Sequence, residues 1–108
     1  MSNELKFIET KEAIEILLEE LGNTCIGYRR FINFNPHDGC NYEEHYIKID
    51  TCILKIIPDE STGDGEQDDY IKVYICNYKL EHVGKMLSAR LFPEDICELG
   101  RFLKFILG

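Results

Sequence analysis

Apolar residues recur along this chain with two different spacings, which predict where helices and strands lie. Residues 10–21 place apolar side chains at helical intervals and glutamates on the remaining surface. Thr10 is expected to cap this helix, and Gly22 and Asn23 are expected to end it. The pattern therefore predicts an amphipathic helix with an acidic outer surface. Its predicted core residues are Ala13, Ile14, Leu17, Leu18 and Leu21.

Four later segments alternate between apolar and polar residues, as half-buried strands do. We predict strands over residues 24–34, 46–57, 70–78 and 85–92, with Pro58 ending the second. Residues 35–39 and 81–84 read as turns, and residues 59–69 as a long loop. One side of each strand is predicted to face the core: Ile26, Tyr28, Ile32 and Phe34; Ile47, Ile49 and Ile53; Ile71, Val73 and Ile75; Leu87, Ala89 and Leu91.

The last segment, residues 93–107, has the pattern of a second helix. Pro93 suits its first position, where a missing N–H costs little. Gly100 is disfavoured inside a helix, which indicates a close approach, expected to be to the sheet. The apolar surface is wider than one packing face requires, so this helix is either well buried or forms a homodimer contact. Its apolar stripe comprises Ile96, Leu99, Leu103 and Ile106.

The predicted element order is α-β-β-β-β-α. Short sequential connections favour a four-stranded antiparallel meander, and both helices should cover one face of it. The expected fold is therefore a two-layer α+β domain over residues 1–108, flanked by an N-terminal and a C-terminal helix. No apolar run approaches the ~20 residues that span a bilayer, and the N-terminus lacks a signal-peptide pattern. Five cysteines without a C-x-x-C motif suit a reducing compartment, so we expect a cytoplasmic protein.

The formal net charge of −8 is unevenly distributed. Residues 1–24 carry six acids and two bases, and residues 59–84 carry seven acids and two bases. Such a chain should be repelled by nucleic acid and attracted to basic protein surfaces. The alternative for the acidic loop is a solvated segment that only aids solubility. The candidate partner-binding residues are Glu12, Glu15, Glu19, Asp59, Glu60, Asp64, Glu66, Asp68 and Asp69.

Two further constellations predict different chemistry. Aromatic and basic residues alternate on the strand side opposite the predicted core, and such a face can stack nucleobases and contact phosphates. Its members are Tyr46, Lys48, Tyr70, Lys72, Tyr74 and Tyr78. The alternative is ordinary cross-strand Tyr–Lys pairing or burial in a dimer, and the net charge of −8 weighs against nucleic acid. His37, Cys40 and His45 supply three ligands that zinc accepts, although closed zinc sites usually contain more cysteine.

These patterns lead to one leading hypothesis. We expect a small acidic, non-enzymatic interaction protein, without a cofactor, that docks on a basic protein surface. Phage or mobile-element inhibitors of the anti-CRISPR or DNA-mimic type, and immunity proteins that neutralise a basic nuclease, have this chemistry. Single-stranded nucleic-acid binding and zinc binding are the alternatives.

Overall fold

The computed structural model describes residues 8–37, 39–59 and 70–107, and it is an α+β fold with an antiparallel sheet. The strands are β1 (Cys25–Asn35), β2 (Cys40–Ile49), β3 (Ile53–Asp59), β4 (Tyr70–Cys76) and β5 (Leu87–Arg90). They neighbour one another in sequence order, and every pairing is antiparallel. The helices are α1 (Thr10–Leu21), the short 3-10 helix η1 (Gly22–Thr24) and α2 (Pro93–Leu107). The predicted class and meander are confirmed, with five strands in place of four.

The extra strand comes from a turn inside the segment predicted as one strand, residues 46–57. Ile49 N–H donates to the Cys52 carbonyl (2.8 Å), and Cys52 N–H donates to the Ile49 carbonyl (3.3 Å), which closes a two-residue turn at Asp50 and Thr51. This turn shifts the buried positions by one residue. Ile47 and Ile49 are buried before it, and Cys52, Leu54 and Ile56 are buried after it. Ile53 was predicted to share their face, but it lies half-buried on the opposite one.

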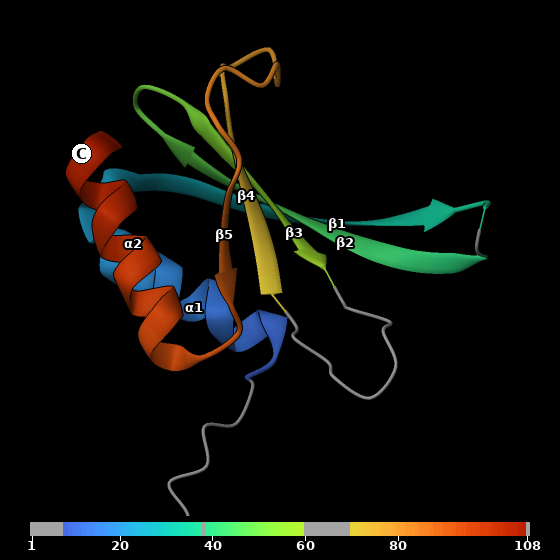
Figure 1. The fold of residues 1–108 in the computed structure, drawn as a ribbon. Coiled ribbons are helices and arrows are strands. Elements are labelled where there is room, and N and C mark those ends of the chain that lie inside the picture. Colours follow the sequence, from blue (N-terminus) through green and yellow to red (C-terminus); the bar gives the residue numbers. More distant parts are fainter. Residues whose placement is uncertain (1–7, 38, 60–69, 108) are drawn as a thin grey trace, which may run out of the picture.

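Both long helices lie on the same side of the sheet, and the core fills the space between the two layers (Figure 1). α1 contributes Ala13, Ile14, Leu17 and Leu21, and α2 contributes Ile96, Leu99 and Leu103. The sheet contributes the isoleucines, leucine and valine of β2, β3 and β4: Ile47, Ile49, Leu54, Ile56, Ile71 and Val73. Within the described ranges, neither long helix is extended and apolar enough to cross a lipid bilayer.

The end of α1 at Gly22 and the start of α2 at Pro93 are as predicted, and the N-cap of α1 is not. Glu9, and not Thr10, occupies the N-cap of α1, and no side chain there caps the helix. Gly22 ends α1 with a φ of 53°, a conformation that glycine adopts without strain, and its N–H donates to the Leu18 carbonyl. Pro93 is the first residue of α2, as predicted.

Pro58 lies inside β3, opposite Ile71, although it was expected to end the strand. β2 pairs with β3 only from Ile53 to Ile56, so no strand of the described chain pairs with β3 on that side at Pro58. A proline is tolerated at such a position, because a nitrogen on the open side of a strand needs no hydrogen-bond partner.

β1 and β2 continue beyond the rest of the sheet as a two-stranded hairpin. β2 pairs with β1 from Cys40 to Ile49 but with β3 only from His45 to Lys48. The first half of β2 therefore has β1 as its one paired strand in the described chain, and Figure 1 shows this hairpin extending away from both helices. The apolar positions of β1 are consequently exposed, although they were predicted as core: Ile26, Tyr28, Ile32 and Phe34. Ile26 falls at a register shift between Cys25 and Gly27, which leaves it unpaired with β2.

Candidate functional site

The sheet surface opposite the helices collects the aromatic and basic residues predicted to lie together. One row across β1 to β4 runs Arg29, Tyr46, Lys55 and Tyr74. Tyr70 and Lys72 continue the same surface along β4, opposite Arg90 and Ser88 of β5. We call this the outer sheet face. Four aromatic or basic members were not singled out from the sequence: Arg29, Phe31, Lys55 and Arg90.

The aromatic groups of the outer sheet face contact protein groups. The Tyr74 ring stacks on His82 with centroids 4.6 Å apart, and Phe31 meets Tyr46 edge to face at 5.5 Å. Lys48 Nζ lies 5.2 Å from the Tyr78 ring centroid. Tyr78 follows β4 in a turn, and its hydroxyl donates to the Ile49 carbonyl at 2.6 Å. These contacts are the cross-strand and cation–π pairs of a structured surface.

Glu44 is the acidic centre of the outer sheet face. Its Oε2 accepts a hydrogen bond from the Tyr46 hydroxyl (3.1 Å) and forms an ion pair with Lys55 Nζ (3.2 Å). Asn33 donates to its Oε1. Burial, and then the bond to Glu44, raise the pKa of Tyr46 to about 12, so the phenol stays protonated at neutral pH. A depression of about 630 Å³ lies above this centre, between Phe31, Lys48 and Leu80.

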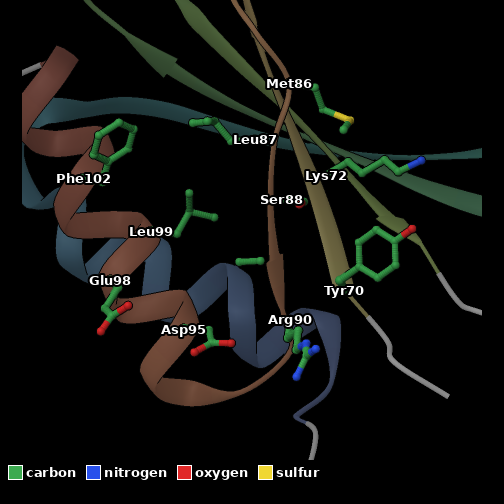
Figure 2. Close-up of a pocket in the computed structure, with 11 residues that line it drawn as sticks. Tyr70, Lys72, Met86, Leu87, Ser88, Arg90, Asp95, Glu98, Leu99 and Phe102 are labelled. Atoms are coloured by element: carbon green, nitrogen blue, oxygen red, sulfur yellow. The ribbon is translucent and has the colours of Figure 1, made fainter. Parts of the chain in front are cut away.

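A second groove, of about 960 Å³, runs along β5, which pairs with β4 alone among the described strands (Figure 2). Figure 2 shows Asp95 and Leu99 on the α2 side of β5, and Tyr70 and Lys72 on the other side. Charge thus changes sign across β5, from acidic on the helix layer to basic on the outer sheet face. This separation by layer could not be inferred from regional charge totals.

The acidic surface of α1 consists of Glu12, Glu15 and Glu19, which are all exposed. A fourth glutamate of that helix, Glu20, forms an ion pair with Arg101 of α2 at 3.3 Å. Asp59 ends β3, where it pairs with Tyr70. The remaining predicted partner-binding residues lie outside the described residues: Glu60, Asp64, Glu66, Asp68 and Asp69.

The three predicted zinc ligands are not brought together. His37 and Cys40 are exposed around the hairpin turn, whereas His45 is buried further along β2. Five residues of extended strand separate Cys40 from His45, a span of about 17 Å. Among the described residues, no group of three or more His, Cys, Asp or Glu side chains could hold a metal ion.

His45 instead belongs to a buried cluster on the helix side of the sheet. Its exposed fraction is 2%, its ring stacks on Tyr28, and its Nδ1 lies 2.6 Å from the Tyr28 hydroxyl. Burial lowers the pKa of His45, Glu43 acts in the opposite direction, and Arg30 lowers it further. Nε2 is buried without a hydrogen-bond partner in the described structure. The ring borders a cleft of about 290 Å³ between α1 and the first two strands.

The last helix leaves large apolar side chains in solvent. Phe102, Phe105 and Ile106 are all exposed, with Phe105 at 86%. Ile106 was predicted to lie in the buried stripe. The homodimer contact predicted for residues 93–107 therefore has apolar surface available, and it stays a prediction.

Comparisons with protein-family models, curated proteins and solved structures gave no match.

Proposed function

We propose that this chain is a small non-enzymatic interaction protein that docks on a basic surface of another protein. The observation that carries the proposal is the separation of charge by layer. α1 presents Glu12, Glu15 and Glu19 to solvent, and Lys11 is the one base in its sequence. A row of exposed carboxylates attracts Lys and Arg side chains and can occupy the positions that phosphates take on such a surface.

The same proposal includes the acidic segment 59–69, which adds six carboxylates in the sequence. Two kinds of basic partner suit this chemistry. One is a nucleic-acid-binding groove, the target of a DNA-mimic or anti-CRISPR inhibitor. The other is a basic nuclease held inactive by an immunity protein. The five cysteines are all free, which fits action in the cytoplasm.

Replacing Glu12, Glu15 and Glu19 with glutamine is expected to weaken partner binding at least tenfold. Glutamine keeps the side-chain length and helix propensity but removes three charges that face solvent. Binding would be measured by affinity purification from cells of the source organism, with and without phage infection, and then by titration of the recovered protein. The wild-type complex should weaken as salt rises and should be displaced by heparin, a polyanion that competes for basic surfaces.

A control neutralises two exposed acids that lie outside both long helices, Asp50 and Glu81, and should bind nearly as well as wild type. A second variant neutralises Asp64, Glu66, Asp68 and Asp69, and should lose affinity tenfold or more if the loop contributes. If the α1 variant and the loop variant both fold and both bind the partner with wild-type affinity, docking through acidic residues is contradicted.

The outer sheet face favours a second candidate function, binding of single-stranded nucleic acid. Five bases lie on its strands, at Arg29, Lys48, Lys55, Lys72 and Arg90, and Glu44 already neutralises Lys55. The aromatic residues among them provide rings of the kind on which bases stack. The contacts within this face, such as Tyr74 with His82, explain the same residues as structural, so this candidate ranks second.

If the face binds nucleic acid, a fluorescein-labelled oligothymidylate should increase in anisotropy at low salt, with a Kd between about 1 and 100 μM. Changing Lys48 and Lys72 to glutamine should reduce the affinity and the salt dependence together, because each base neutralises phosphate. Changing Lys11 and Lys104, which lie on α1 and α2, serves as the control of equal charge. An unchanged anisotropy across that concentration range would remove this candidate.

A further inference from the structure

Among the described strands, β1 is at one edge of the sheet, and it is unusually apolar for an edge strand. It is 11 residues long and pairs with β2 on one side alone in the described structure. Phe31, Ile32 and Phe34 are exposed on it, with Ile32 at 58% and Phe34 at 61%. Edge strands in monomers are usually kept short or interrupted by charge or proline, because their open N–H and C=O groups pair with other strands. From Phe31 to Asn35, this strand has no charge and no proline.

We propose that the β1 edge pairs with the β1 edge of a second copy of this chain, antiparallel and about a two-fold axis at Phe31. In such a pair, residues directly opposite share a face of the sheet, so the pairing joins even positions to even and odd to odd. The regular part of β1 runs from Gly27 to Asn35, after the register shift, and Phe31 is its midpoint. The proposal is independent of the acidic partner-binding surface.

This register is self-complementary at every position. Phe31 meets Phe31 of the second copy, Arg29 meets Asn33, and Gly27 meets Asn35 on the outer face. On the helix side, Tyr28 meets Phe34, and Arg30 meets Ile32. No like charges stand opposite one another, and each Arg30 keeps its ion pair with Glu43 of its own chain. Aromatic pairs placed directly across two strands are among the stabilising cross-strand contacts.

The two neighbouring registers of the same parity rule are less favourable. An axis at Arg30 places two arginines opposite each other and carries the pairing across the irregular Cys25–Gly27 segment. An axis at Ile32 sets Tyr28 opposite Pro36, which has no N–H to donate. The pattern of β1 therefore selects the Phe31 axis.

The pairing also covers the projecting hairpin. The start of β1 lies at the helix layer, where Cys25 packs against the core, and its end reaches the hairpin tip. Antiparallel pairing brings the tip of each copy beside the start of β1 in the other. Phe34 of one copy then lies next to Tyr28 of the other, at the 290 Å³ cleft that Ile14 and Leu18 of α1 also line. A cavity of about 150 Å³ already holds a benzene ring, so the cleft has room for a phenyl group.

The first test is the mass of the full chain in solution by light scattering during size-exclusion chromatography. The expected result is a species of about twice the 12.6 kDa chain mass. A species of 12.6 kDa at about 100 μM, well above the Kd of a micromolar dimer, would overturn the proposal.

Disulfide trapping then tests whether the two-fold axis lies at Phe31, in a background where the exposed Cys40 is replaced by serine. Phe31→Cys should form a covalent dimer under mild oxidation, because side chains directly opposite across two strands have Cβ atoms about 4.5–5.5 Å apart. Position 29 lies on the same face, but it is four residues along the strand from position 29 of the second copy, about 13 Å away. Arg29→Cys should therefore stay monomeric on a denaturing gel. Equal trapping of both variants, or trapping at neither position, would overturn the proposed register.

A charged substitution distinguishes a dimer that forms through β1 from one that forms through the apolar surface of α2. Phe31→Lys sets two lysines face to face and should raise the dimer dissociation constant at least tenfold, whereas the control Phe105→Lys should leave it unchanged. Circular dichroism checks that both variants fold. If Phe105→Lys dissociates the dimer and Phe31→Lys does not, the subunits meet through α2 and the proposal is wrong.

Discussion

Replacing Gly100 with alanine is expected to lower the free energy of unfolding by about 1–3 kcal/mol, as overpacking of a closed contact does. Helix propensity alone predicts the opposite, a gain of about 1 kcal/mol. A Cβ on Gly100 would lie 2.7 Å from Glu20 Cβ and 3.5 Å from Leu17 Cδ2. The α1 backbone fixes the position of Glu20 Cβ, so the two helices must separate to admit the methyl group. Urea denaturation measures the change.

Substitutions of Glu20 distinguish the steric cause from others. Glu20→Gly removes the opposing Cβ, so Gly100→Ala should cost much less in that background. Glu20→Ala removes the ion pair with Arg101 but keeps the Cβ, so the cost of Gly100→Ala should persist. If Gly100→Ala stabilises the protein in all three backgrounds, α1 and α2 do not approach this closely.

Gly100 also shows what a sequence pattern specifies. Its presence in an apolar helix predicted a close approach, and the approach exists, but α1 is the partner in place of the sheet. Helical periodicity identifies the buried stripe of α2 from the identity of its residues. Which element fills the space opposite that stripe depends on the arrangement of both layers, and the sequence of α2 contains no information about it.

The missed turn at Asp50 and Thr51 had a detectable signal. Apolar positions are odd before it, at Ile47 and Ile49, and even after it, at Leu54 and Ile56. A change of parity marks a turn or bulge, because successive side chains in a strand alternate between faces. The change of parity was hidden because residues 52–57 are apolar at both odd and even positions, with Lys55 as the one exception. Such a run is typical of a strand that is covered on both faces. The turn itself contains no glycine or proline.

The exposed hairpin could not have been predicted from alternation. Ile32 and Phe34 share the helix-facing parity of β1, as expected, yet both are exposed. Alternation defines which face a side chain occupies, whereas coverage depends on how far the helices extend over the sheet. The outer sheet face was easier to predict, because parity alone places Tyr46, Tyr74 and Lys72 together.

Mild acid is expected to destabilise the fold through His45. An imidazole in the unfolded chain has a pKa near 6.5, and burial lowers the pKa of His45 in the folded protein. As pH falls below about 6.5, the unfolded chain therefore binds a proton that the folded protein does not, and stability decreases until pH reaches the lowered pKa. Each unit of difference between the two pKa values costs about 1.4 kcal/mol. The charged groups that line the cleft beside His45 are Lys11, Glu15, Arg30 and Glu43. Among them, Glu43 raises the pKa of His45 and Arg30 lowers it.

Urea denaturation of wild type and His45→Phe from about pH 7.5 to about pH 5.5 isolates this contribution, since most carboxylates titrate lower. Phenylalanine keeps an aromatic ring against Tyr28 but cannot be protonated. Wild type should lose stability over this range, and His45→Phe should lose much less. His37→Gln, at the exposed hairpin turn, should follow wild type. Parallel pH profiles for wild type and His45→Phe would show that another group carries the dependence, and that the buried ring accepts a proton in the fold as readily as in water.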